Sequence, residues 1–149
     1  SMPVEMWILL RLIASFCGVF GFSVMFNSPA RLATMAALIG AVANTLRLEL
    51  VDLAGMPPAV AAFIGALTAG IFASLIKNKA GYPRISLTVP SIVIMVPGLY
   101  LYRGIYNLGM MSLSVAASWF AAAILIIAAL PLGLIFARIL TDRTFRYCT

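Results

Sequence analysis

The residues best suited to bind a charged solute lie around two prolines, in the stretch PSIVIMVPGLYLYRG at residues 90–104. A proline inside a helix removes one backbone hydrogen bond and displaces the carbonyl group four residues earlier. In so apolar a chain, Pro90 and Pro97 predict an interrupted helix, and Gly98 adds conformational freedom at the second proline. A helix that restarts at Leu99 would direct its first N–H groups and its positive dipole end into the interruption, where they favour a carboxylate.

Four side chains are candidates for further contacts with such a carboxylate. Arg103 follows the interruption closely enough to lie at its mouth, where a guanidinium can bind a carboxylate through two hydrogen bonds. Thr88, Ser91 and Asn44 are predicted to supply polar contacts from within the membrane. The structural alternative is a plain proline kink without a ligand, in which Arg103 caps the span beside a belt of tyrosines.

A second group of charged side chains lies in the stretch ANTLRLELVD and in the first apolar run. Arg47, Glu49 and Asp52 fall near one end of their apolar run, and Arg11 is predicted to lie on the same side of the membrane. The sequence therefore predicts an ion pair between Arg11 and either Glu49 or Asp52. Ionisable residues in membrane spans are functional candidates by default. A structural salt bridge is the favoured interpretation at this depth, and a coupling proton on one of the two carboxylates is the alternative.

The composition shows that lipid surrounds these groups. Hydrophobic residues make up 64% of the chain and charged residues only 9%, with a mean hydropathy of +1.11, whereas about a quarter of a soluble domain is charged. Histidine is absent, and Cys17 and Cys148 lie far apart in the sequence. These features predict no enzyme activity, no metal site and no cofactor. No phosphate-binding loop of the G-x-x-x-x-G-K-[ST] type is present, so that the chain is not expected to hydrolyse ATP.

Five apolar runs are long enough to cross a bilayer, which takes roughly 20 residues each. The predicted spans are 6–26, 32–50, 56–76, 85–102 and 110–139. The sequence thus predicts an all-α integral membrane protein with a single transmembrane domain over residues 1–149. The fourth span is predicted to be interrupted by Pro90 and by Pro97-Gly98. An arrangement of four spans, with residues 32–50 as a hairpin or surface segment, is the alternative.

Basic residues indicate the orientation, because they gather on the cytoplasmic side of short membrane loops. Seven of the ten basic residues fall on one predicted side: Arg31, Lys77, Lys79, Arg84, Arg138, Arg143 and Arg146. The other three, Arg11, Arg47 and Arg103, fall on the opposite side. The N-terminus is therefore predicted outside and the C-terminus in the cytoplasm of a bacterial inner membrane. The net charge of +6 is mainly this orientation signal, and no nucleic-acid partner is predicted.

Small residues recur along the predicted helices, most clearly in the Ala66-x-x-x-Gly70 spacing. In lipid, such spacings let two helices approach closely. Ordinary helix packing is the favoured interpretation. Because five helices have little interior of their own, we also expect contacts with membrane lipid and with other subunits, including a homo-oligomer as one arrangement.

The stretch VPSIVIMVPGLYLYRGIYNL, residues 89–108, resembles the membrane motif of the threonine/serine exporter family, of the ThrE type. It is similar to the C-terminal half of that family, which also occurs as a separate small subunit of about this length. The matching positions are Pro97, Gly98, Arg103 and Gly104.

The resemblance implies export of small amino acids such as threonine and serine, and, in related two-subunit exporters, of dicarboxylates such as succinate. It also implies a partner that carries the complementary membrane half and a cytosolic domain. That half is not found in this sequence, so transport by the chain alone is an open question. The alternative function is a structural or assembly subunit of a membrane complex that binds no solute itself.

Overall fold

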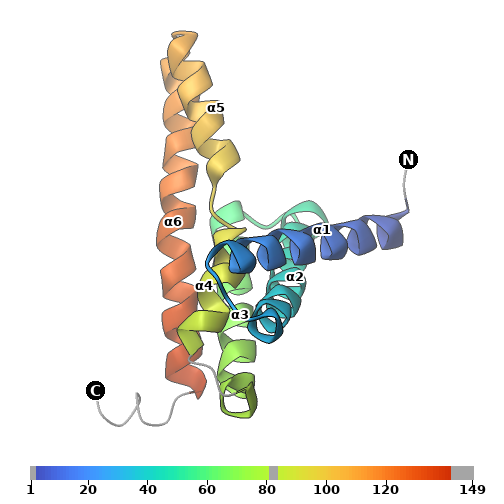
Figure 1. Ribbon diagram of the computed structural model, residues 1–149. Helices are drawn as coiled ribbons and strands as arrows, with labels where there is room; N and C mark the ends of the chain where they lie inside the picture. Colours follow the sequence, from blue (N-terminus) through green and yellow to red (C-terminus); the bar gives the residue numbers. More distant parts are fainter. Residues whose placement is uncertain (1–2, 81–83, 142–149) are drawn as a thin grey trace.

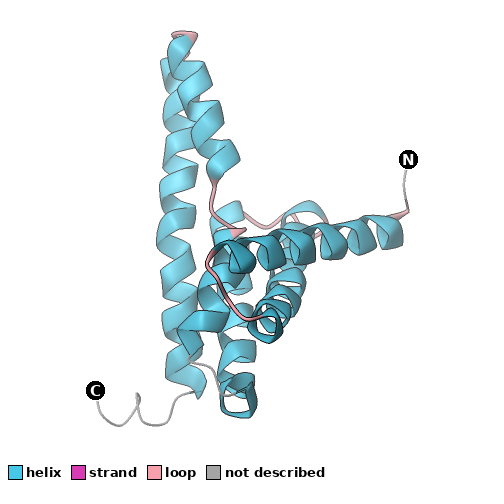
Figure 2. Ribbon diagram, viewed as in Figure 1, coloured by secondary structure: helices cyan, strands magenta, loops and turns pink. Residues whose placement is uncertain are grey.

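A computed structural model describes residues 3–80 and 84–141, for residues 77–80 and 84 the backbone alone (Figure 1). The described part of the chain is helical and contains no strand (Figure 2). Its helices are α1 Val4–Met25, α2 Ala30–Asp52, α3 Pro58–Ala80, α4 Arg84–Val93, α5 Gly98–Gly109 and α6 Leu113–Thr141. Five segments are long and apolar enough to cross a membrane, with α4 and α5 together forming the fourth. The predicted all-α membrane fold with five spans is confirmed.

The turns between the first three helices follow from local sequence. Asn27 adopts a positive φ of 60° after α1, a conformation that asparagine tolerates better than most residues. Pro29 then precedes the first turn of α2, where its missing N–H group costs nothing. Gly55, with a φ of 67°, reverses the chain before α3. α2 itself is one continuous helix and not a hairpin.

The fourth span is interrupted at residues 94–97, between α4 and α5. Pro90 lies inside α4, which continues through Val93, so that the chain leaves the helix only as it approaches Pro97. The interruption changes the neighbours of the chain. α4 packs against α1, α2 and α3, whereas α5 packs against α6 as an antiparallel hairpin that extends beyond the other helices (Figure 1).

α3 and α6 are in close contact through small residues. The Ala66-x-x-x-Gly70 spacing of α3 faces a second such spacing, Gly133-x-x-x-Ala137, on α6. A Cβ atom added at Gly70 would lie 2.5 Å from the Cβ of Ala137, and one added at Gly133 would lie 2.7 Å from that of Ala66. The two helices thus approach at backbone distance, as small residues permit in lipid.

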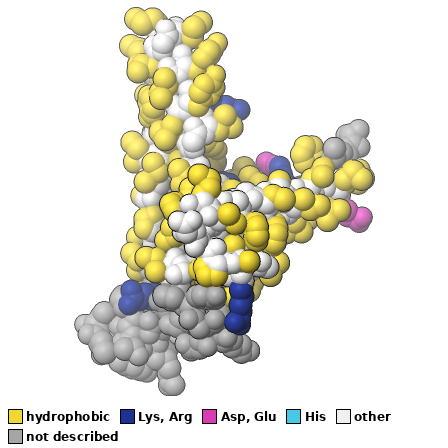
Figure 3. Space-filling view, in the orientation of Figure 1, with side chains coloured by type: hydrophobic (Ala, Val, Ile, Leu, Met, Phe, Trp, Pro, Cys, Tyr) yellow, Lys and Arg dark blue, Asp and Glu magenta, His cyan; other side chains and the backbone are white. Residues whose placement is uncertain are grey.

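The outer surface is largely apolar. Figure 3 shows hydrophobic side chains over most of the visible face, with basic side chains at its lower end and others higher on the molecule. Large exposed side chains such as Leu9, Ile105 and Leu125 fit contact with lipid. Five of the basic side chains that predict the orientation lie outside the described part of the chain: those of Lys77, Lys79, Arg84, Arg143 and Arg146. Cys148 lies outside it as well.

Candidate functional site

A cavity of about 430 Å³ opens at the interruption of the fourth span. We call it the break cavity. All four residues of the interruption, 94–97, line it, together with Arg47 and Asp52 of α2 and Tyr100 and Arg103 of α5. Arg11 of α1 and Ile126 of α6 also reach its wall. Pro97 and Arg103, which the sequence predicts to act together, therefore do face one space.

The break cavity lies near the middle of the longest helix. α6 has 29 residues and Ile126 is close to its centre, so that about 20 Å of helix extends on either side at 1.5 Å per residue. If α6 crosses the bilayer, Ile126 lies near the midplane. Transporters with discontinuous helices bind their solutes at this depth.

The backbone of the interruption leaves two donors at the cavity. Val96 N–H donates to the carbonyl of Val93 at 3.2 Å, so the acceptor that Pro97 leaves without its helical donor is satisfied by a turn. No side chain caps α5, and its first i−4 bond runs from Leu101 N–H to the carbonyl of Pro97 at 3.1 Å. Among the described residues, the N–H groups of Leu99 and Tyr100 remain without a backbone partner of this kind.

Arg47 is held at the cavity by an asparagine behind it. The Oδ1 atom of Asn44 accepts hydrogen bonds from Nε and Nη2 of Arg47, at 3.1 and 2.8 Å. The Nδ2 atom of Asn44 donates to Ser15 Oγ of α1 at 2.8 Å. Asn44 is only 4% exposed, so these bonds satisfy a buried amide and fix the guanidinium. Asn44 is predicted as a contact for the solute, but it does not line the break cavity and instead supports Arg47, which does.

The positive charge of Arg47 has no carboxylate partner in the described part of the chain, and Glu49 and Asp52, the carboxylates of the same helix, both pair with Arg11. Arg11 Nη1 lies 2.5 Å from Glu49 Oε1, and Arg11 Nη2 also pairs with Asp52. Arg11 therefore joins α1 to both carboxylates at the end of α2, where the sequence predicts a pair with one of them. An unpaired charge in a membrane protein is costly, which makes Arg47 the residue that most requires an anion.

Arg103 stacks on the ring of Trp119, a contact that the sequence did not predict. Its Cζ atom lies 4.9 Å from the ring centroid of Trp119 on α6. Tyr100 meets the same ring edge-on, at 5.3 Å between centroids and 84° between planes. A tryptophan in an apolar helix ordinarily indicates an anchor at the membrane interface, so the sequence carries no separate signal for this contact.

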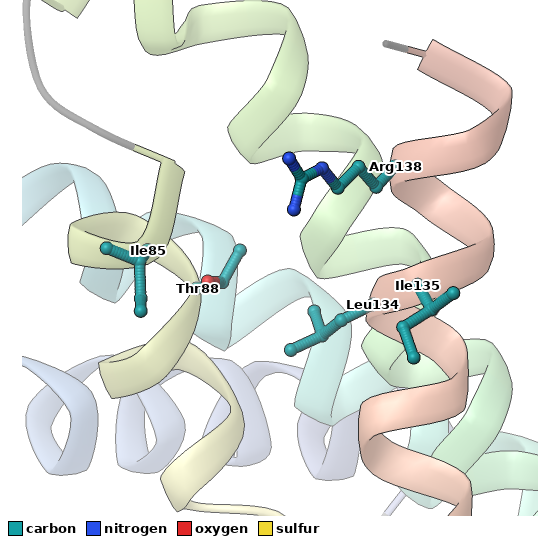
Figure 4. Close-up of a pocket in the computed structure, with 5 residues that line it drawn as sticks. All are labelled: Ile85, Thr88, Leu134, Ile135 and Arg138. Carbon is teal, nitrogen blue, oxygen red and sulfur yellow. The ribbon is translucent and has the colours of Figure 1, made fainter. Parts of the chain in front are cut away.

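The remaining predicted contacts lie elsewhere. Thr88 lines a second cavity of about 330 Å³ between α4 and α6, where Figure 4 shows it facing the segment of Leu134 and Arg138. Ser91 is fully buried, and its hydroxyl donates to the Leu87 carbonyl oxygen at 2.6 Å. Gly98 borders open space, since a Cβ added there would meet nothing within 4 Å. None of these three residues is among those that line the break cavity.

One comparison with known proteins identifies a family for this chain. A family model described as Threonine/Serine exporter, ThrE, matches residues 11–140. That range includes every residue that lines the break cavity. No curated protein and no solved structure gives a significant match. The matched family is one of transporters and not of enzymes. The chain is a multi-pass membrane protein, and it belongs to the threonine/serine exporter family.

Proposed function

We propose that this chain is the solute-binding subunit of a secondary transporter that exports small carboxylate-bearing solutes. These are amino acids of the threonine and serine type, or dicarboxylates such as succinate. The observation that carries the proposal is the guanidinium of Arg47, which faces the break cavity without a carboxylate partner in the described part of the chain. A bound carboxylate offsets the cost of holding that charge away from water.

The charged and polar groups that line the cavity have separate roles in this proposal. Arg103, which is exposed at the cavity, attracts the anion, and Arg47 together with the N–H groups of Leu99 and Tyr100 holds its carboxylate. The ammonium group of an amino acid would face Asp52. The second carboxylate of a dicarboxylate would face Arg103 instead, so that one cavity can take either class of solute.

We further propose that the chain works in a bacterial inner membrane with a second membrane subunit, which carries the complementary half and a cytosolic domain. Two similar halves with odd numbers of spans can sit in inverted orientation, as in many secondary transporters. A proton gradient or solute exchange would drive the export.

Solute flux tests the proposal directly. The purified chain, alone and with its partner subunit, is reconstituted into vesicles loaded with labelled threonine, serine or succinate. We expect the chain alone to bind at least one of the three solutes and the pair to release it. If the pair assembles stably but neither binds nor releases any of them, the chain is an assembly subunit without a solute site.

The orientation can be tested by fusing reporters to the C-terminus. A cytoplasmic C-terminus, as the basic residues predict, is expected to give a fluorescent green fluorescent protein fusion and an inactive alkaline phosphatase fusion. The same reporters fused after the loop between α2 and α3 should give the opposite result. A C-terminal phosphatase fusion with full activity would reverse the proposed orientation.

A further inference from the structure

We propose that Trp119 is a positioning residue for the solute site: its ring holds Arg103 by the face of the guanidinium and leaves the N–H donors free for a carboxylate. This inference rests on the proposed function, because it assigns a role within the same cavity. It concerns a residue of α6 that does not itself line the break cavity.

The contacts place Trp119 beneath both polar side chains that α5 presents to the cavity. Tyr100 and Arg103 are three residues apart, so they lie on one face of α5. Both line the break cavity, and both contact the ring of Trp119, Arg103 over its face and Tyr100 edge-on. One side chain of α6 therefore contacts two side chains of α5, and Arg103 is the charged one.

The geometry of the guanidinium explains why a ring is suited to this task. A guanidinium is planar and carries all five N–H donors in its plane. A carboxylate partner within the protein would occupy those donors, whereas an aromatic ring occupies only the face. Arg103 has no carboxylate partner in the described part of the chain. It is thus held in place and still able to bind a carboxylate through two hydrogen bonds.

Arg11 provides an internal comparison. Its guanidinium lies 5.5 Å from the ring centroid of Trp7, so it too has an aromatic neighbour. Its donors, however, are taken by Glu49 and Asp52. The donors of Arg11 are therefore used within the protein, whereas Arg103 lines the break cavity with no carboxylate partner among the described residues.

α5 and α6 pack closely next to Trp119. Gly104 is buried, and a Cβ added there would lie 2.8 Å from the ring of Phe120. α5 and α6 are thus close at the level of Arg103 and Trp119. Because the arginine is ordered before the solute arrives, less side-chain freedom is lost on binding, which raises the affinity.

Affinity measurements test this role. Trp119→Leu removes the ring face, and we expect the dissociation constant of the solute to rise about tenfold, the size of a partly shielded cation–π contact. Trp119→Phe keeps an aromatic face and is expected to stay within about threefold of the wild type. In an Arg103→Gln background, Trp119→Leu should have no further effect, because the residue that it positions is absent.

Fluorescence gives an independent readout. Trp7 and Trp119 are the two tryptophans of the chain, so Trp7→Phe leaves Trp119 as the sole indole. Titration of the full-length Trp7→Phe protein with succinate, threonine and serine is expected to shift the emission for the solute that binds. The additional change Arg103→Gln should abolish the shift.

The outcomes separate this inference from the proposed function. If the wild type binds a solute, Arg47→Gln does not, and Trp119→Leu binds as the wild type does, the inference is overturned and the proposed function stands. Equal losses in Trp119→Leu and Trp119→Phe, or a further loss in the Arg103→Gln background, assign Trp119 to packing alone and also overturn it. A wild type that binds none of the three solutes overturns both.

Discussion

Replacing Arg47 with glutamine is expected to weaken solute binding about 100-fold while leaving the protein folded. Losing one partner of a desolvated charge pair typically costs 2–5 kcal/mol or more, and each 1.4 kcal/mol corresponds to about a factor of ten. Glutamine keeps a polar group beside Asn44 but removes the charge that binds the carboxylate. Equilibrium dialysis with labelled threonine, serine and succinate measures the loss.

The effect of Arg47→Gln on stability should have the opposite sign from that of an ordinary core substitution. Arg47 has no carboxylate partner in the described part of the chain, so that in the absence of solute its charge carries an uncompensated desolvation cost. We therefore expect the melting temperature without solute to stay the same or rise. Saturating solute should stabilise the wild type and not the variant, since a ligand stabilises only the state that binds it.

Arg31→Gln is the matched control. It removes the same charge from the same helix, but Arg31 lies exposed in the first turn of α2, far along the helix from Arg47. Its binding constants should equal those of the wild type. Arg47→Gln with wild-type affinity, or with a melting temperature that falls sharply, would make Arg47 a structural residue and leave the break cavity without its main anion-binding group.

The sequence predicts the spans and the interruption because both depend on local chemistry. Apolar runs of sufficient length require a helix in lipid, since backbone groups must be bonded within the segment. Pro97 lacks the N–H group that would bond to the carbonyl of Val93, and α4 ends at Val93, whereas Gly98 is already the first residue of α5. Pro90 lacks the same donor, yet α4 continues past it to Val93.

The composition of the site was predicted only in part, because it depends on which helix faces which. Arg103 and Pro97 are close in sequence, so their meeting follows from one helix. Thr88 and Ser91 precede the interruption by only a few residues, yet the rotation of α4 directs them away from the cavity. Trp119 belongs to another helix, and its contact with Arg103 depends on how the α5–α6 hairpin packs, which the spacing of residues does not reveal.

The same limit applies to the small residues. Ala66 and Gly70 are recognisable from their spacing, but the facing pair on α6 is identified only by the packing. The close contact at Gly133 leads to the largest expected effect on stability. A Cβ added there would lie 2.5 Å from the carbonyl oxygen of Phe63 and 2.9 Å from the backbone nitrogen of Leu67. Those atoms belong to the backbone of α3 and cannot move without the helix.

Gly133→Ala is therefore expected to lower the melting temperature by about 10 °C, corresponding to an overpacking cost of about 3 kcal/mol for a chain of this size. Gly21→Ala is the matched control: Gly21 lies within α1 with nothing within 4 Å of an added Cβ. There the same change should be neutral or slightly stabilising, because alanine favours a helix by about 0.5–1 kcal/mol over glycine. Differential scanning fluorimetry of the detergent-purified proteins measures both.

Second-site changes then distinguish a backbone clash from a side-chain clash. At Gly70 the nearest obstacle is the Cβ of Ala137, at 2.5 Å, so Ala137→Gly should restore most of the stability that Gly70→Ala loses. Ala66→Gly should not rescue Gly133→Ala, because the carbonyl of Phe63 remains in the way. Rescue at both positions would mean that α3 and α6 are held apart by side chains and not by backbone contact. The solute affinity of the folded fraction should stay unchanged throughout, since neither position lines the break cavity.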